Sequence, residues 1–442
     1  MQGRRAEVRK EFGCYLDGRG ISLLCRILSL SERGAAMGTR VCHVFIIGCK
    51  GIPAKYGGYE TFVDKLTEYH EDDDEIQYHV ACKSDRSCEF TYHNAACFGV
   101  HVPNIGAAQA VSYDIMAFRR SLSYIKQHRI ERPIVYMLTC RIGPFLRPLY
   151  RELHRLGGVL LVNPDGHEWL RAKWPEPVKK YWKLSEALTV RFADLLICDS
   201  INIERYIKTE YRKYSPNTRY ISYGAEVYSR LGDDPSGKIV EWLERNRLKD
   251  HGYYLIVGRF VPENNYETML REYLASSTKR PLVIVSNVDK NSRFWKELRQ
   301  KTRFDQDPRV QFVGTIYDQE LLTEVRAHAY AYIHGHEVGG TNPSLLEALG
   351  STSLNLLLDV GFNHEVGLDA ALYWTKKNGS LRTLINSVDT LPQAEIEQYS
   401  KRAKARISSG YSWDLIASSY KKLFADICGS AHSRSSEIDE DD

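Results

Sequence analysis

The feature that most constrains the fold is a regular alternation of short apolar runs with longer amphipathic stretches. Residues Val41–Gly48 (VCHVFIIG) form such a run, which ends at a glycine and is followed by a glycine-rich loop and a helical pattern. The same succession recurs along the chain, and it predicts parallel strands joined by crossover helices. The strands expected on this pattern are Val41–Gly48, Ile134–Thr139, Val159–Asn163, Leu195–Cys198, Tyr253–Gly258, Leu282–Ser286, Val310–Val313, Tyr330–His334 and Leu354–Leu358.

Two α/β units of similar size follow from this pattern. It pauses at the turn-rich segment Gly232–Gly237 (GDDPSG) and restarts beyond residue 235. A chain of 442 residues is long enough for two or three domains. We therefore predict two doubly wound domains, a further C-terminal helix and two non-globular ends. The expected boundaries are an extension at 1–36, domains at 37–230 and 231–408, a helix at 409–428 and an acidic, disordered tail at 429–442.

The first 36 residues differ in pattern from the rest of the chain. Asp17 and Arg26 closely flank the short apolar run Ile21–Leu24, which makes it a poor signal peptide. Two interpretations stay open. The segment is either an extension that precedes a start at Met37, or a basic amphipathic helix over residues 19–32 that lies on a membrane surface.

Composition argues against several classes of protein. The formal net charge of +4 is too small to indicate nucleic-acid binding. No run of about 18 apolar residues occurs, so no membrane-spanning helix is expected. The ten cysteines include no CxxC pair, so zinc-ribbon spacing is absent. Cysteines within apolar runs act as small apolar side chains, which favours a reducing, cytosolic compartment. These cysteines are Cys42, Cys49, Cys140 and Cys198.

The loops that follow the expected strands are the candidate sites, because doubly wound sheets bind ligands at the carboxyl ends of their strands. The first such loop contains Gly57 and Gly58, which let a ligand approach the backbone, and Lys55, which adds a cation. The helix after it offers free amides and a partial positive charge, which suit a phosphate. The alternative is a tight turn that needs glycine.

A second loop, Asn163–Trp169 (NPDGHEW), collects titratable side chains at a strand end. Asp165, His167 and Glu168 are residue types used for proton transfer and for hydrogen bonds to sugar hydroxyls. The alternative is an Asx turn that caps a helix.

Arg259 directly follows the expected strand Tyr253–Gly258. A guanidinium at this position reaches the crevice and can clamp a diphosphate with its planar fork. The alternative is an ordinary surface ion pair.

The loop at residues 334–349 (HGHEVGGTNPSLLEAL) is the strongest signal. Gly340, Thr341 and Asn342 lead into a helix with proline at its start, so we expect first-turn amides to point into the crevice. Glu347 lies about one turn further on and can accept hydrogen bonds from a ribose. The alternative is a well-capped helix with a surface glutamate.

Two weaker patterns concern metals and membranes. Asp305-Gln306-Asp307 has the spacing of a metal-binding carboxylate pair but lies in a polar loop away from the strand ends, so no metal is expected. Basic and aromatic residues alternate over residues 141–183, which suits an anionic membrane surface. An exposed helix with a buried stripe explains the second pattern equally well. The basic members are Arg141, Arg147, Arg151, Arg155, Arg171, Lys173, Lys179, Lys180 and Lys183.

Two segments carry a family resemblance. GIPAKYGGYETF at residues 51–62 and GHEVGGTNPSLLEAL at residues 335–349 resemble the retaining GT-B glycosyltransferases of glycosyltransferase family 4, and within it the bacterial β-1,4-rhamnosyltransferases. The similarity covers most of residues 41–427. It implies a GT-B fold, in which two Rossmann-like, doubly wound domains face a central cleft. The first is then the acceptor domain, the second is the nucleotide-sugar donor domain, and the last helix crosses back to the first domain.

This resemblance implies transfer of L-rhamnose from dTDP-L-rhamnose to a sugar hydroxyl of a lipid-diphosphate-linked precursor of capsule or cell-wall polysaccharide. Configuration is retained, and neither a metal nor another cofactor is expected. The enzyme is expected in the cytoplasm, in peripheral contact with the anionic inner face of the plasma membrane, with no nucleic-acid partner. Three alternatives stay open: a family 4 transferase that uses a UDP- or GDP-sugar, a nucleotide-sugar epimerase, and a non-catalytic nucleotide-sugar-binding protein.

The resemblance also assigns roles to individual residues. Arg259 is expected to neutralise the diphosphate leaving group, His167 to contact the donor sugar, and Asp165 to join them in catalysis. The residues expected to bind the donor are Lys55, Gly57, Gly58, Asn265, Glu337, Gly340, Thr341, Asn342 and Glu347.

The chain departs from the family pattern at two points. The family often has a glutamate eight positions before the one at Glu347, but Gly339 stands there, and Glu337 is the candidate substitute. The family's lysine shortly after Arg259 is also missing, and Asn264 and Asn265 stand in its place. A neighbouring cation such as Lys55 is then needed to bind the diphosphate.

Overall fold

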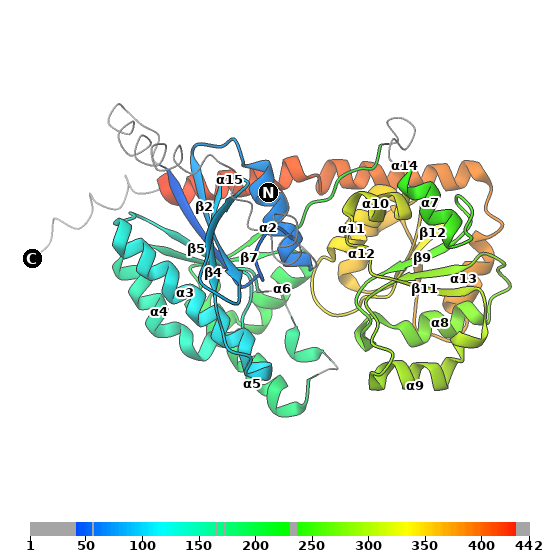
Figure 1. Ribbon diagram of the computed structural model, residues 1–442, viewed down its shortest axis with the longest axis horizontal. Helices are drawn as coiled ribbons and strands as arrows, with labels where there is room; N and C mark the ends of the chain where they lie inside the picture. Colours follow the sequence, from blue (N-terminus) through cyan, green and yellow to red (C-terminus); the bar gives the residue numbers. More distant parts are fainter. Residues whose placement is uncertain (1–40, 55–56, 165–166, 172–173, 230–236, 430–442) are drawn as a thin grey trace, which may run out of the picture. The chain divides into compact units, whose positions relative to one another are not determined.

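The computed structural model describes residues 41–54, 57–164, 167–171, 174–229 and 237–429 (Figure 1). The predicted extension, most of the GDDPSG linker, nearly all of the acidic tail, Lys55 and Asp165 lie outside these residues.

The first sheet is centred on a strand that is buried on both faces. Within the described residues it has eight strands, all parallel to their neighbours except the edge strand β3, which is antiparallel to β4. On β1, Val44 lies opposite Tyr78 on one side and Ile134 on the other. The strand order is β3 (Glu89–Tyr92), β4 (Ala95–Val100), β2 (Ile76–Lys83), β1 (Cys42–Ile47), β5 (Ile134–Met137), β6 (Val159–Val162), β7 (Leu195–Cys198) and β8 (Thr218–Tyr220).

The second sheet has the strand order of a doubly wound dinucleotide-binding fold, with the first strand at the switch point. Its six described strands are all parallel. The two parallel, doubly wound sheets confirm the fold class predicted from the sequence. The order is β11 (Val310–Gly314), β10 (Leu282–Val285), β9 (Tyr254–Val257), β12 (Ala331–His334), β13 (Leu354–Leu358) and β14 (Leu372–Trp374).

Helices connect most strands of both sheets, whereas β2, β3 and β4 follow one another directly (Figure 1). Their amphipathic stripes face the sheets, as on the first helix, where Phe62, Val63 and Leu66 are fully buried. The helices are α2 (Gly58–Tyr69), α3 (Gln109–His128), α4 (Gly143–Arg155), α5 (Glu176–Phe192), α6 (Ile201–Glu210), α7 (Lys238–Arg245), α8 (Tyr266–Leu274), α9 (Arg293–Thr302), α10 (Gln319–Ala327), α11 (Pro343–Ser351), α12 (Gly361–Gly367), α13 (Ser380–Val388), α14 (Gln393–Gly410) and α15 (Trp413–Gly429).

The nine expected strands are all present, and five strands, β2, β3, β4, β8 and β14, are not expected from the sequence. β2 is missed because polar residues interrupt its apolar pattern. One of them, His79, is nevertheless buried and stacks on Phe45 with ring centres 4.2 Å apart. β8 and β14 are only three residues long, which is too short for a periodic pattern.

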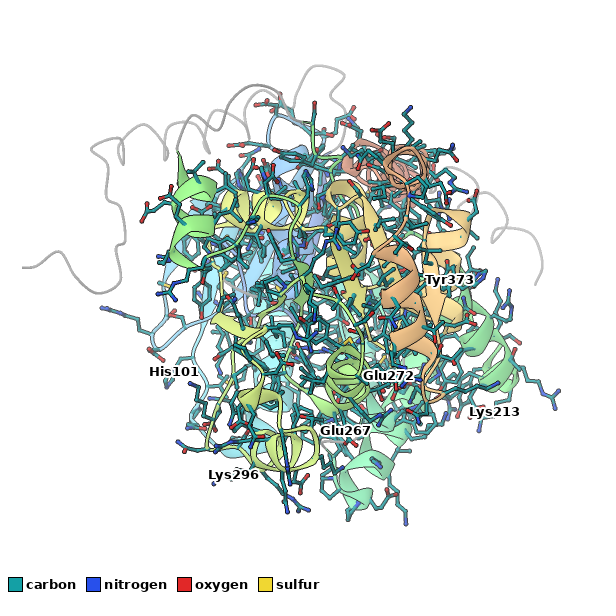
Figure 2. The ribbon with its side chains drawn as sticks, turned by 90° about the vertical axis from the view of Figure 1, so that its right-hand side faces the viewer. His101, Lys213, Glu267, Glu272, Lys296 and Tyr373 are labelled. Atoms are coloured by element: carbon teal, nitrogen blue, oxygen red, sulfur yellow. A yellow bond between two sulfur atoms is a disulfide. The ribbon has the colours of Figure 1, made fainter. Side chains whose placement is uncertain are left out.

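Two acidic residues of α8, Glu267 and Glu272, have different surroundings (Figure 2). Glu267 pairs with Lys301 at 2.8 Å at the surface. Glu272 is buried and accepts the backbone N–H of Arg382, with the two atoms 3.2 Å apart. This bond anchors the start of α13 against α8.

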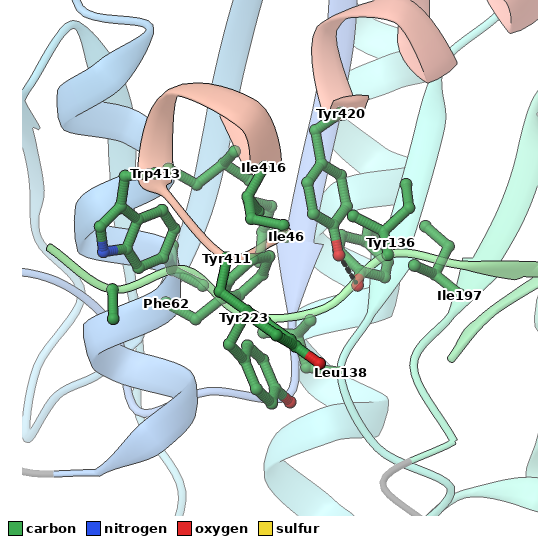
Figure 3. Packing of buried hydrophobic residues seen from close by; sticks show 14 of the residues in the cluster. Ile46, Phe62, Tyr136, Leu138, Ile197, Tyr223, Tyr411, Trp413, Ile416 and Tyr420 are labelled. Atoms are coloured by element: carbon green, nitrogen blue, oxygen red, sulfur yellow. Dashed lines mark hydrogen bonds between the residues drawn. The ribbon is translucent and has the colours of Figure 1, made fainter. Parts of the chain in front are cut away.

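The last helix, α15, packs against the first sheet rather than the second (Figure 3). Tyr420 of α15 and Tyr136 of β5 are both fully buried, and their hydroxyls lie 3.0 Å apart. Trp413 packs against Phe62, and its ring occupies the space where a Cβ of Gly224 would lie, 2.5 Å from the ring. The chain therefore leaves the second sheet along α14 and ends in the core of the first.

A disulfide joins Cys42, at the start of β1, to Cys428, at the end of α15. The sequence instead predicts Cys42 to be a free, small apolar side chain, and this prediction is wrong. The partner is 386 positions away, so no local pattern reveals the bond. No helix among the described residues is long and apolar enough to cross a membrane.

A carboxylate on α12, a helix beside the second sheet, caps α6, a helix beside the first sheet. Glu365 of α12 accepts hydrogen bonds from the Ser200 hydroxyl and the Ile201 amide, each at 2.8 Å, and from the Asn202 amide at 3.1 Å. These amides belong to the first turn of α6, where a negative charge is favourable. The contact ties α12 to the carboxyl end of β7.

Candidate functional site

One cavity of about 460 Å³ collects the loops at the carboxyl ends of strands from both sheets. From the first sheet it is lined by residues that follow β1, β5, β6 and β7, and from the second by residues that follow β9, β10, β11 and β12. These are the edges at which doubly wound sheets bind ligands. The predicted residues Gly57, Gly58 and Arg259 line the cavity. Gly340, Thr341, Asn342 and Glu347 line it as well.

The loop after β1 needs glycine at Gly57 but not at Gly58. Gly57 has φ of 133°, and a Cβ there would lie 2.0 Å from a carboxylate oxygen of Glu60. A Cβ on Gly58 would lie 3.4 Å from Pro343, the first residue of α11. Glu60 accepts the Lys50 amide at 2.8 Å, which closes the loop. Gly57 thus permits the backbone turn of this loop, and Gly58 lies beside the start of α11.

The loop after β12 lies against the end of β7. A Cβ on Gly340 would be 2.0 Å from Oδ1 of Asp199, and the Thr341 hydroxyl donates to the Asp199 carbonyl at 2.7 Å. Asn342 caps α11, because its side chain accepts the Ser344 amide at 2.9 Å. The Thr341 and Asn342 side chains are therefore occupied by the protein itself.

The loop after β12 has backbone amides available for a ligand. Pro343 has no N–H, and the Ser344 amide is bonded to Asn342. The amides of Gly340, Thr341 and Asn342 form no hydrogen bond with any described residue. Consecutive unbonded amides before a helix N-terminus are the kind of group that can bind an anion. The expected first-turn amides therefore lie just before the helix rather than within it.

Arg259 is exposed at the cavity wall and has no acidic partner among the described residues. The two asparagines that stand in place of the family's lysine bind the neighbouring loop. Asn264 contacts His336 at 2.8 Å, and Asn265 donates to the Gly335 carbonyl at 2.8 Å. Asn265 is buried outside the cavity lining, so it holds the loop after β12 in place. Lys50 supplies a second cation to the lining.

Two buried histidines stand behind these loops. Burial lowers the pKa of His334 to about 3. Burial lowers the pKa of His336 well below its usual value, and the charges near it, which include Arg171 and Arg259, lower it further. Both rings are therefore neutral at pH 7, and the cavity wall gains no charge from them.

The first sheet contributes polar side chains that the sequence assigns elsewhere. Arg141 lines the cavity with one guanidinium nitrogen 3.5 Å from the buried Asp114, and Arg171 lies 2.5 Å from Glu168. The basic pattern over residues 141–183 predicts both arginines at a membrane surface. Their placement in the cavity cannot be read from spacing, because it depends on how the loops after β5 and β6 turn.

Other predicted residues lie outside the cavity lining. His167 has φ of 60° and packs on Tyr206 with ring centres 4.1 Å apart. Burial lowers its pKa. Glu337 forms an ion pair with Lys376. The roles assigned to these residues, and to Lys55 and Asp165 outside the described residues, stay predictions.

The DQD segment is engaged in ion pairs. Asp305 lies 2.5 Å from Arg299, and Asp307 lies 2.7 Å from Arg309. No cluster of three or more His, Cys, Asp or Glu residues among those described has the geometry to hold a metal ion.

Comparison with known proteins identifies the architecture. Residues 41–226 match a family model described as a domain of unknown function, DUF1972. No curated protein sequence matches the chain. Among solved structures, sucrose-phosphate synthase from Thermosynechococcus elongatus is similar, with 16% identity, a TM-score of 0.69 and coverage of 89% of this chain and 100% of that chain. A glycosyltransferase from Rickettsia africae has 12% identity, a TM-score of 0.66 and coverage of 88% and 99%. HepE of Anabaena in complex with UDP has 14% identity, a TM-score of 0.62 and coverage of 87% of this chain and 100% of that chain.

These likenesses extend over both sheets, and at such identities they establish the fold. The chain has the GT-B fold, with two Rossmann-like sheets whose strand ends line one cavity. This confirms the GT-B architecture implied by the two sequence segments.

The buried His334 predicts a pH dependence of stability. Its folded pKa of about 3 lies below its unfolded value of 6.5, so the unfolded state takes up a proton first as the pH falls. The free energy of unfolding should drop by about 1.6 kcal/mol between pH 6.5 and pH 5.0 on account of this residue, because the slope reaches about 1.4 kcal/mol per pH unit only below the unfolded pKa. Denaturant unfolding at both pH values, with the wild type and His334→Gln, measures the difference. Equal pH slopes for the two proteins would contradict it.

Proposed function

We propose that this protein is a glycosyltransferase that moves a hexosyl group from a nucleotide sugar to a hydroxyl of a saccharide acceptor. One observation carries the proposal: the amides of Gly340, Thr341 and Asn342 and the side chain of Arg259, which have no partner among the described residues, share a cavity. Amides and a guanidinium that converge on one space bind and stabilise a diphosphate. The first sheet supplies the polar side chains that an acceptor hydroxyl needs on the other side of the same cavity.

In the proposed reaction the acceptor oxygen bonds to the anomeric carbon while the bond from that carbon to the β-phosphate oxygen breaks. The acceptor proton passes to the departing phosphate oxygen. Arg259 and the loop amides stabilise the negative charge that develops on the diphosphate. Attack from the face of the leaving group retains the configuration. Lining acids such as Glu168 and Glu186 are held by Arg171 and Tyr206, which fits a mechanism without a carboxylate nucleophile.

We further propose dTDP-L-rhamnose as the donor and a lipid-linked saccharide as the acceptor. The segments at residues 51–62 and 335–349, which resemble rhamnosyltransferases, support this choice. UDP-sugars are the alternative donors, because HepE, of similar fold, is known in complexes with UDP and with UDP-glucose.

Release of nucleoside diphosphate tests the proposal. The full chain is incubated with dTDP-L-rhamnose, UDP-glucose, UDP-GlcNAc or GDP-mannose, with and without a lipid-diphosphate-linked saccharide. We expect release of dTDP that depends on the acceptor. Acceptor-dependent release from a UDP- or GDP-sugar alone would overturn only the donor assignment. Conversion of the donor sugar without an acceptor would indicate an epimerase, and binding without turnover would indicate a binding protein.

Substitution of Arg259 tests its role in the leaving-group step. Arg259→Ala should lower kcat by about 100-fold, because one preorganised donor to a developing charge contributes on this scale. Arg293→Ala is the matched control, since the Arg293 side chain is 91% exposed on α9 and pairs only with Glu297 among the described residues. Circular dichroism checks that both variants fold. Equal kcat values for the two variants would remove Arg259 from the mechanism.

Peripheral contact with an anionic membrane is supported by a patch on α4 and α5. The two helices pack together, and the Gly143 amide donates to the Ser185 hydroxyl at 2.9 Å. Phe145 and Leu184 are 48% and 53% exposed. Exposed cations accompany them on the same helices, which suits a surface of anionic lipid. These cations are Arg147, Arg151, Arg155, Lys180 and Arg191.

Vesicle binding tests the patch. The wild type should sediment with vesicles that contain phosphatidylglycerol, and less so at high salt or with pure phosphatidylcholine. The double variant Phe145→Ser/Leu184→Ser should bind at least about tenfold more weakly, because it removes two apolar anchors. Val240→Ser, which changes a residue that is 54% exposed on α7, serves as control. Vesicle binding that is unaffected by the double variant would show that the patch is not the contact.

A further inference from the structure

The carboxylate of Glu347 in the cavity wall is shared with a buried arginine. Arg326 of α10 is 2% exposed, and its Nη2 forms an ion pair with Oε2 of Glu347 on α11. The Glu347 side chain is 30% exposed, and both residues line the cavity. The sequence does not reveal this pair, because Arg326 stands in an ordinary amphipathic helix, 21 positions before Glu347.

The arginine is held in place by its surroundings. Its Nη2 donates to the Ser344 hydroxyl at 3.3 Å, and that hydroxyl lies 3.2 Å from the hydroxyl of the buried Tyr332. The Thr352 hydroxyl donates to the backbone carbonyl of Arg326 at 2.9 Å. A guanidinium this deep in the wall cannot swing away when a ligand arrives, so Oε2 of Glu347 stays occupied.

The other carboxylate oxygen of Glu347 is available. No described residue donates a hydrogen bond to Oε1, and the side chain faces the cavity. An ionised carboxylate only accepts hydrogen bonds, so the ligand group beside it must be a donor such as a hydroxyl. A phosphate at this point would be repelled.

The position of Glu347 identifies the part of the ligand that it meets. The anion-binding amides end at Asn342, and Glu347 lies five residues further along α11, roughly 7.5 Å at 1.5 Å per residue. In a nucleoside diphosphate bound at those amides, the pentose lies next to the phosphates. The hydroxyls that reach Glu347 are therefore those of the pentose.

We infer that Arg326 leaves Glu347 one oxygen for the pentose, so that the site accepts a 2′-deoxyribose as well as a ribose. A vicinal diol binds a carboxylate best when each hydroxyl donates to its own oxygen. With both oxygens open, a missing 2′-hydroxyl leaves one of them unpaired, and such a loss typically weakens binding by about tenfold or more. Here Arg326 keeps Oε2 paired whichever pentose is present. Arg326 is thus a specificity-determining residue, and this inference rests on the proposed nucleotide-sugar function.

Matched pairs of nucleotides test the inference on the full chain. Isothermal titration compares UDP with dUDP, ribothymidine 5′-diphosphate with dTDP, and GDP with dGDP, and each pair differs only at the 2′ position. We expect Kd values within about threefold of each other in whichever pair binds best. A ribonucleotide bound at least tenfold more tightly than its deoxy partner would overturn the inference and leave the proposed function standing. If no nucleotide binds, the proposed function and the inference both fail.

A variant isolates the arginine. Arg326→Gln releases Oε2 of Glu347, so the preference for the ribonucleotide over its deoxy partner should rise to about tenfold. Arg299→Gln is the control, because Arg299 is 62% exposed on α9 and pairs with Asp305 away from the cavity. A ratio in Arg326→Gln equal to that of Arg299→Gln would contradict the role of Arg326. If Arg326→Gln does not fold, as judged by circular dichroism, the wild-type ratio alone decides the inference.

Discussion

The close contact of Gly340 with Asp199 is the constraint on which the cavity depends. A Cβ at Gly340 would lie 2.0 Å from the Asp199 carboxylate, so a larger residue would force that buried carboxylate or the loop after β12 to move. The Thr341 hydroxyl secures this position by donating to the Asp199 carbonyl. Because the loop is held there by side-chain contacts and by Gly340, its amides are not needed for its own folding. They stay open towards the space that the strand ends of both sheets share.

Most of the strands that the sequence predicts are largely buried, and the half-buried β11 is an exception. β1, β9 and β12 read as unbroken apolar runs, because parallel strands covered on both faces have no polar side. β2 escapes the same reasoning because its buried His79 looks polar, although the ring is neutral and stacks on Phe45. The disulfide between Cys42 and Cys428 is not predicted either, because the return of α15 to the first sheet is a property of the whole fold.

The site divides in the same way into local and non-local features. Gly57, Gly340 and Arg259 are found from local patterns, because a glycine or a cation just after a strand can be recognised from the few residues around it. The burial of Arg326 and Arg171 depends on which helices and loops pack around them, and spacing alone places such residues at the surface. The sequence therefore predicts which loops line the cavity better than it predicts which charged side chains lie in the cavity wall.

The pairing of charges in the cavity wall bears on how the proposed site would bind a diphosphate without the lysine that the resembled family has after its arginine. Arg171 is neutralised by Glu168, and Arg326 by Glu347. His334 and His336 are uncharged because of burial. Arg259 and Lys50 have no acidic partner among the described residues, so the positive potential of the lining is concentrated at these two side chains. A dianionic leaving group then finds its strongest attraction beside the open amides, while a neutral sugar hydroxyl meets paired groups that it can bond without displacing a charge.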